Sequence, residues 1–72
     1  MPRSAETELQ AQKSNLTERV RRLNALEDQL KRAKERQDGK AVEKLSREIE
    51  NQKGYVRRAR EGVDRAQARL GL

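Results

Sequence analysis

The sequence predicts an all-α fold, a two-helix antiparallel coiled-coil hairpin, from three observations. Apolar residues recur at alternating three- and four-residue steps in both halves of the chain, strong helix formers fill the positions between them, and one strong turn signal lies near the middle. Seventy-two residues make at most one domain. We expect helix one at about residues 4–37, the turn at about 38–40 and helix two at about 41–70.

Helix one is predicted from a seven-residue repeat of leucines, as a coiled-coil seam requires. The four leucines are Leu9, Leu16, Leu23 and Leu30. The intervening seam positions are expected to hold Lys13, Val20, Glu27 and Lys34. Ser4 is a suitable N-cap, and the acidic residues that follow it suit the positive end of the helix dipole.

Helix two has a more regular pattern, in which the three–four alternation continues without interruption. Its residues are Val42, Leu45, Ile49, Gln52, Val56, Ala59, Val63, Ala66 and Leu70. Asp38 and Gly39 form the turn signal, because glycine accepts the left-handed backbone that ends helices and aspartate can cap the next helix. A second helix-stop pattern, Leu70-Gly71-Leu72, follows helix two.

A single continuous helix is the structural alternative, because Gly39 would cost it only about 1 kcal/mol relative to alanine. The phase of the pattern argues against it. Extending the first seam from Leu30 by threes and fours reaches Ala41, one residue out of step with Val42. An antiparallel register that centres the turn beside Gly39 avoids this mismatch.

That register pairs seam residues of the two helices. Leu9 is expected to face Leu70 and Leu16 to face Val63. Glu27 is expected to face Gln52 in a polar layer, and such a layer often fixes the register at a cost in stability.

Composition limits the classes of function. Charged residues make up 42% of the chain and apolar ones 32%, with no cysteine and no histidine. The formal net charge of +6 favours acidic partners such as nucleic acid, anionic lipid or an acidic protein surface. Without cysteine there are no disulfides, thiolate zinc sites or thiol nucleophiles. No apolar run is long enough to span a bilayer, so we expect a soluble cytoplasmic protein with no membrane partner.

Enzymatic activity is not expected. Glycine-rich phosphate loops, metal-ligand spacings and nucleophile motifs are absent from the sequence. A carboxylate such as Glu27 lacks the partner acid or base and the pocket that catalysis needs. We therefore predict no catalytic residue, no metal ligand, no cofactor and no small-molecule substrate.

One flank of the hairpin is a predicted oligomer interface, because it gathers small and apolar residues. These are Leu26, Ala33, Ala41, Tyr55 and Gly62. A lone hairpin with so thin a core is marginally stable, and stacking two such flanks would complete a four-helix bundle. A homo-oligomer is therefore expected, with a dimer favoured. The alternative is that Leu26 and Tyr55 only cover each other across one hairpin.

A band of arginines is the second candidate surface, expected at one height of the hairpin: Arg19, Arg21, Arg22, Arg57, Arg58 and Arg60. Planar guanidinium groups donate paired hydrogen bonds to phosphate or carboxylate, so the band suits an acidic partner or nucleic acid. Nearby acids, among them Glu18 and Glu61, would neutralise part of its field. A solvated charged face is the alternative interpretation.

In size and helix pattern the chain resembles the Rop-type RNA-binding regulators of plasmids, which dimerise as hairpins into four-helix bundles. It is also similar in shape to small helical-hairpin proteins of the large ribosomal subunit. The resemblance is one of architecture alone and transfers no residues. Two hypotheses follow. The first is a structural or adaptor protein that self-associates and binds or regulates a larger protein, and the second is a small RNA- or DNA-binding protein.

Overall fold

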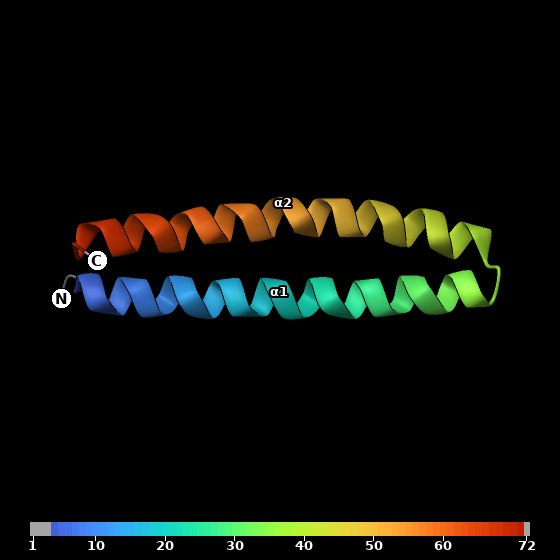
Figure 1. The fold of residues 1–72 in the computed structure, drawn as a ribbon, viewed down its shortest axis with the longest axis horizontal. Coiled ribbons are helices and arrows are strands. Elements are labelled where there is room, and N and C mark those ends of the chain that lie inside the picture. Colours follow the sequence, from blue (N-terminus) through green and yellow to red (C-terminus); the bar gives the residue numbers. More distant parts are fainter. Residues whose placement is uncertain (1–3, 72) are drawn as a thin grey trace.

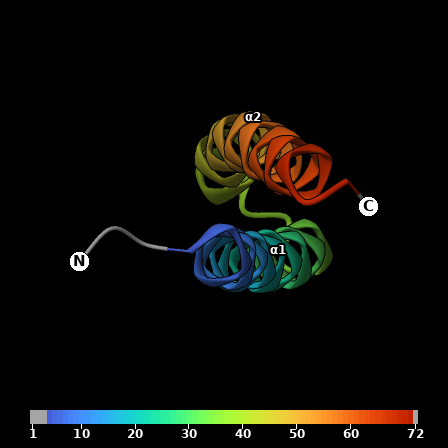
Figure 2. The same ribbon diagram turned by 90° about the vertical axis from the view of Figure 1, so that its left-hand side faces the viewer.

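Two antiparallel helices make up the fold (Figure 1). The computed structural model describes residues 4–71, in which helix α1 spans Ala5–Glu35 and helix α2 spans Gly39–Arg69. They form a rod of 51 × 20 × 15 Å, with residues 36–38 as the connection. An end-on view shows that the two helices are tilted relative to each other (Figure 2). The predicted all-α helical hairpin is confirmed.

Both helices begin at the caps that the sequence predicts. The Ser4 hydroxyl oxygen accepts a hydrogen bond from the Thr7 backbone N–H at 3.1 Å, and Glu6 and Glu8 lie in the first turn of α1. Asp38 caps α2 in the same way, because its Oδ1 accepts from the Ala41 N–H at 3.2 Å. Each such cap contributes about 1 kcal/mol.

In the turn, the residue that adopts the left-handed backbone is not the predicted one. Gln37 has φ 57°, whereas Gly39 is the first residue of α2. The Gln37 N–H donates to the Lys34 carbonyl and the Asp38 N–H to the Ala33 carbonyl, each at 3.0 Å. These two bonds form a Schellman motif, which requires a left-handed residue directly after the C-cap.

The expectation that Gly39 ends the first helix is therefore wrong, and the capping of α2 explains why. Asp38 is the N-cap, so the residue after it must already be helical. The helix stop at the other end of the chain is confirmed, since α2 ends at Arg69 and Gly71 has φ 74°.

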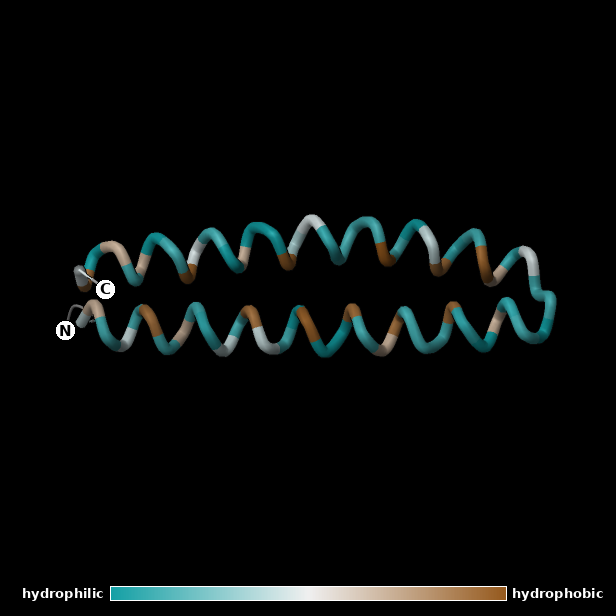
Figure 3. Tube along the Cα trace, in the orientation of Figure 1, coloured by the Kyte–Doolittle hydropathy of each residue, from teal (hydrophilic) through white to brown (hydrophobic). Residues whose placement is uncertain are grey.

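The core is the seam between the helices, where the apolar residues of each helix face the other (Figure 3). On α2 the predicted seam is confirmed, with Ile49, Gln52, Ala59, Val63 and Ala66 buried. Near the chain termini, Leu9, Val63 and Ala66 form a buried cluster against which Leu16 and Leu70 pack. This cluster agrees with the predicted register.

On α1 the intervening seam positions differ from the prediction. Leu26 and Ala33 are buried, with 8% and 0% of their surface exposed, and Gln12 and Arg19 are half-buried. Three residues expected at these positions are exposed instead: Lys13, Glu27 and Lys34. At these three positions the seam lies one residue to the N-terminal side of the expected one, because that orientation buries Leu26 in place of a charged side chain. The fourth expected residue, Val20, is half-buried like its neighbour Arg19.

The expected Glu27–Gln52 layer is consequently wrong. Gln52 is 9% exposed, and its Oε1 is buried without a hydrogen-bond partner. Glu27 lies in solvent. A buried amide oxygen left without a donor costs about 1–3 kcal/mol, so Gln52 weakens an otherwise apolar seam.

Candidate functional site

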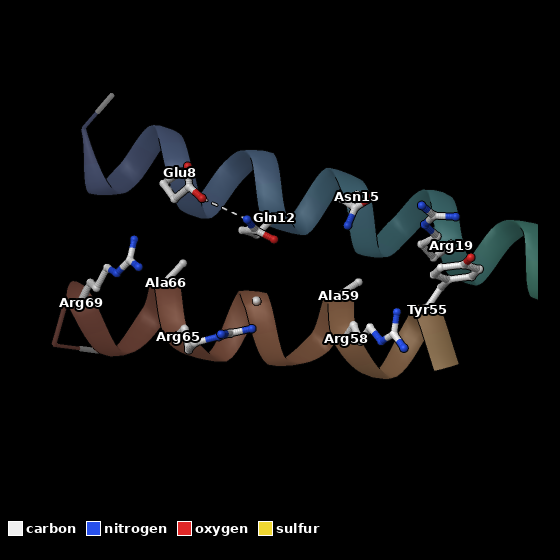
Figure 4. Close-up of a pocket in the computed structure, with 11 residues that line it drawn as sticks. Glu8, Gln12, Asn15, Arg19, Tyr55, Arg58, Ala59, Arg65, Ala66 and Arg69 are labelled. Carbon is white, nitrogen blue, oxygen red and sulfur yellow. Dashed lines mark hydrogen bonds between the residues drawn. The ribbon is translucent and has the colours of Figure 1, made fainter. Parts of the chain in front are cut away.

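An open groove of about 330 Å³ lies on one flank of the hairpin, in the half nearest the chain termini (Figure 4). Both helices line it. Helix α1 contributes Glu8, Gln12, Asn15 and Arg19. Helix α2 contributes Tyr55, Arg58, Ala59, Gly62, Arg65, Ala66 and Arg69. Polar residues of α1 thus face a floor of small residues and three arginines of α2.

The groove exists because the seam is poorly filled here. Gln12 and Arg19 hold α1 seam positions, and on this flank α2 contributes the small side chains of Ala59, Gly62 and Ala66, while Val63 packs with Leu9 in the buried cluster. Gln12 Nε2 donates to Glu8 Oε1 at 3.0 Å. A Cβ atom added to Gly62 would come within 2.5 Å of Gln12 Oε1, so glycine lets this amide lie directly against the α2 backbone.

Tyr55 brings two arginines together at one end of the groove. Its side chain is 43% exposed, and the Arg19 guanidinium carbon lies 4.7 Å from the ring centroid. The Arg58 guanidinium carbon lies 5.9 Å from the same ring. Cation–π attraction is worth about 0.5–1 kcal/mol at such exposed positions. The ring therefore offsets part of the repulsion between two cations that come from different helices.

The other two arginines extend the positive charge along α2 towards the chain termini. Arg65 Nε donates weakly to the Glu61 backbone carbonyl at 3.4 Å, rather than to a carboxylate. Within residues 4–71 the ion pairs are Arg47–Glu43 at 2.6 Å and Lys53–Glu50 at 3.6 Å, and both lie outside the groove. The groove is consequently electropositive, with four arginines and one glutamate in its lining.

The structure brings together only part of the predicted arginine band. Arg19 and Arg58 meet at Tyr55, whereas Arg21 and Arg22 border a separate hollow on the surface of α1. Arg57 and Arg60 are exposed on α2.

Two groove arginines, Arg65 and Arg69, were not among the residues singled out from the sequence. A detectable pattern connects them with the groove. Five residues follow one another at alternating three- and four-residue steps and therefore share one side of α2: Tyr55, Arg58, Gly62, Arg65 and Arg69. Following this stripe from Tyr55 would have found them.

The residues of the predicted oligomer interface fall into two groups in the structure, buried and accessible. Leu26 and Ala33 are buried in the seam of a single hairpin. Ala41 and Gly62 are half-buried, and Tyr55 is the exposed large apolar residue of the described chain. Only the last three therefore remain reachable by a second chain, and the interface itself stays a prediction.

Comparison with known proteins gives no family. No protein-family model, no curated protein and no solved structure matches the chain. Neither helix, over the residues described, has a stretch that is both apolar and long enough to cross a membrane. Residues 4–71 also contain no group of three or more carboxylates placed to hold a metal ion. The arginine-lined groove is thus the candidate site.

Proposed function

We propose that this protein is a non-enzymatic helical-hairpin adaptor that binds a larger protein through the groove. The observation that carries the proposal is the groove itself, in which four arginines from two helices surround a floor of small residues. These arginines have no carboxylate partner within the described part of the chain. A partner that supplies negative charge there lowers their mutual repulsion.

The weak packing beneath the groove also supports a binding role. Gln12 and Arg19 stand where a stable coiled coil has large apolar residues, so this half of the hairpin gives up core stability. A partner in the groove would cover the exposed ring of Tyr55 and the half-buried Gly62, whereas Ala59 and Ala66 are already buried within the hairpin.

Site-specific photo-crosslinking tests the proposal. A benzophenone amino acid replaces Asn15, which lines the groove, or Thr17, which lies about 200° around α1 from it. In a nuclease-treated native lysate, we expect the probe at Asn15 to form a covalent adduct with a protein. This adduct should be lost when Arg58→Gln and Arg65→Gln are introduced. Equal adducts from both positions, or none from Asn15, would contradict the proposal.

Nucleic acid is the second candidate partner, because guanidinium groups bind phosphates as well as carboxylates. Affinity for duplex DNA would then fall with salt, at a slope near −0.9 for each neutralised phosphate. Replacing Arg58, Arg65 and Arg69 with glutamine would flatten that slope by up to about three units. The control replaces Arg21, Arg57 and Arg60, which removes equal charge outside the groove.

Self-association remains part of the proposed function and has its own test. Tyr55 is the large apolar residue left exposed among residues 4–71, so charge at this position should weaken contact between two chains. Sedimentation of wild type and Tyr55→Lys over a concentration series measures this effect. If the variant sediments like the wild type at all concentrations, Tyr55 is not in a homo-oligomer interface.

A further inference from the structure

A second basic hollow, of about 430 Å³, is lined by both helices near the turn. The residues that line it include Gln29, Arg32, Arg36, Ala41, Lys44 and Glu48. Its three cations, which we call the turn cations, are exposed, and the ion pairs within residues 4–71 are formed by other residues. This turn hollow is therefore positively charged, as the groove is.

The groove and the turn hollow lie on the same flank of the hairpin. In a coiled coil, residues a whole number of heptads apart lie on the same side of their helix. On α1, Gln29 of the turn hollow lies fourteen residues after Asn15 of the groove. On α2, Lys44 lies fourteen residues before Arg58 of the groove. One flank thus carries a basic site in each half of the rod.

The two sites are close enough for one chain segment to reach both. At 1.5 Å per residue, Lys44 lies about 21 Å from Arg58 along the axis of α2 and about 31 Å from Arg65. An extended chain covers about 3.4 Å per residue, so these distances correspond to about six and about nine residues. Runs of acidic residues repel themselves and are extended in this way. Once one site is occupied, binding at the second is intramolecular, which raises the overall affinity.

The surface between the two sites is less basic than the sites themselves. Asn51 holds the heptad position midway between Lys44 and Arg58 on α2. On α1, Arg22 lies in the interval, and the acidic Glu18 lines the same surface hollow as Arg22 does. An occupant that matches this pattern has anionic groups at its two ends and uncharged groups between them.

This pattern favours a protein segment over two other occupants. Nucleic acid carries a phosphate at every step of its backbone, so it cannot omit the charges between the two sites. Its bases would also have to displace Arg19 and Arg58 from the Tyr55 ring before stacking on it. A second copy of this chain has a net charge of +6 and would add positive charge to both sites. A protein segment can carry glutamate or aspartate at its ends and uncharged residues between them.

We infer that this flank binds an acidic segment of the partner protein, which has one acidic run at each end and uncharged residues between the runs. One run pairs with Arg58, Arg65 and Arg69 in the groove, and the other pairs with the turn cations. The uncharged residues lie over Asn51 and the exposed ring of Tyr55. The inference rests on the proposed adaptor function and adds the chemistry and the reach of the partner segment.

Two labelled peptides of equal composition and different reach test the inference. Both contain two runs of three glutamates and sixteen glycine and serine residues. In the spaced peptide the glycines and serines separate the two runs, with a root-mean-square length of about 22 Å, and in the contiguous peptide they follow both runs. Only the spaced peptide can place one run in each site. Fluorescence anisotropy with the full chain at fixed salt measures the affinity of each peptide.

The turn cations provide the decisive variant. Replacing Arg32, Arg36 and Lys44 with glutamine should weaken binding of the spaced peptide about tenfold. It should weaken binding of the contiguous peptide no more than about threefold, because that peptide occupies one site at a time. Glutamine forms helix about as well as arginine and lysine, so the variant should keep its helix content. An equal loss for the two peptides would overturn the inference, since it would reflect net charge rather than reach.

A matched triple variant controls for general electrostatic attraction. It replaces with glutamine three exposed cations of the opposite flank: Lys31, Lys34 and Arg60. Both peptides should keep their affinity for this control within about threefold, because exposed charges at a distance are screened by salt. If the turn variant weakens binding of the spaced peptide no more than the control does, the inference is wrong.

The groove should contribute to binding of the spaced peptide as well. Arg58→Gln, Arg65→Gln and Arg69→Gln together should weaken binding of this peptide at least tenfold, and an unchanged affinity would contradict the inference. A single-stranded oligonucleotide with six phosphates matches the charge of the peptide and serves as the nucleic-acid probe. Tighter binding of this oligonucleotide than of the spaced peptide would assign the flank to nucleic acid instead.

Photo-crosslinking at Asn15 separates the inference from the function on which it rests. A weaker protein adduct in the turn variant than in the opposite-flank control supports both. If the Asn15 probe captures a protein equally well in these two variants, the adaptor function stands and the two-site acidic segment is wrong. If the Asn15 probe captures no protein even in the wild type, the adaptor function fails and the inference fails with it.

Discussion

The two halves of the hairpin follow one heptad pattern but fill it differently. Near the turn, the α1 seam consists of Leu23, Leu26, Leu30 and Ala33, opposite Val42, Leu45 and Ile49. Near the chain termini, Gln12 and Arg19 alternate with leucines, and small residues of α2 lie beside them. The first half can hold the helices together, and the second carries the groove. One regular repeat thus contains a half with large apolar seam residues on both helices and a half in which polar seam residues border a groove.

The terminal half keeps an apolar core of its own beside the groove. Its buried cluster consists of Leu9, Val63 and Ala66, with Leu16 and Leu70 packed around it. The ends of a chain open locally at lower free energy than the rest of a protein. We therefore expect the termini to open before the turn, and the groove to be ordered further when a partner binds.

The largest expected effect comes from Leu26, the buried leucine of the turn half. Leu26→Ala should lower the free energy of unfolding by about 2–4 kcal/mol, because it removes buried methyl groups and leaves a cavity. Leu16→Ala, in the terminal half, removes a half-buried side chain and should cost only about 1 kcal/mol. Urea denaturation followed by circular dichroism measures both. An equal loss would show that the halves contribute equally to stability.

Gln52 is the exception within the turn half, and its replacement should sharpen the contrast. Gln52→Leu removes a buried Oε1 that has no donor, so the free energy of unfolding should rise by about 1–2 kcal/mol. Gln12→Leu in the terminal half should gain less, because the Gln12 amide is half-buried and bonded to Glu8. Denaturation and sedimentation of both variants test this. A loss of stability in Gln52→Leu would mean that its amide is satisfied in solution.

The sequence was sufficient to predict the local features of the fold. Ser4 and Asp38 have side-chain oxygens suited to capping, and Gly71 can adopt positive φ without steric cost. The α2 seam was equally predictable, because only one set of positions at three- and four-residue steps is apolar along this helix. Each of these features depends on residues that are close together in the chain.

The phase of α1 was harder to predict, because two frames share its leucines. One frame adds Lys13, Val20, Glu27 and Lys34. The other adds Ala5, Gln12, Arg19, Leu26 and Ala33. The second avoids burying Glu27 and gains Leu26, so comparing what each frame buries would have selected it. The groove was missed for the same reason, because its shape depends on which α1 residues face Gly62.

The turn provides the last prediction, with the smallest expected effects. Gln37 has φ 57°, which costs a residue with a side chain roughly 1 kcal/mol, so Gln37→Gly should raise the free energy of unfolding by about that amount. Gly39→Ala should raise it by about 0.4–1 kcal/mol, since a Cβ there meets no atom within 4 Å and its φ is not positive. If Gly39 held the left-handed backbone instead, both substitutions would be destabilising. Thermal unfolding of the two single variants distinguishes the two turn geometries, because the change in the free energy of unfolding has opposite signs in the two cases.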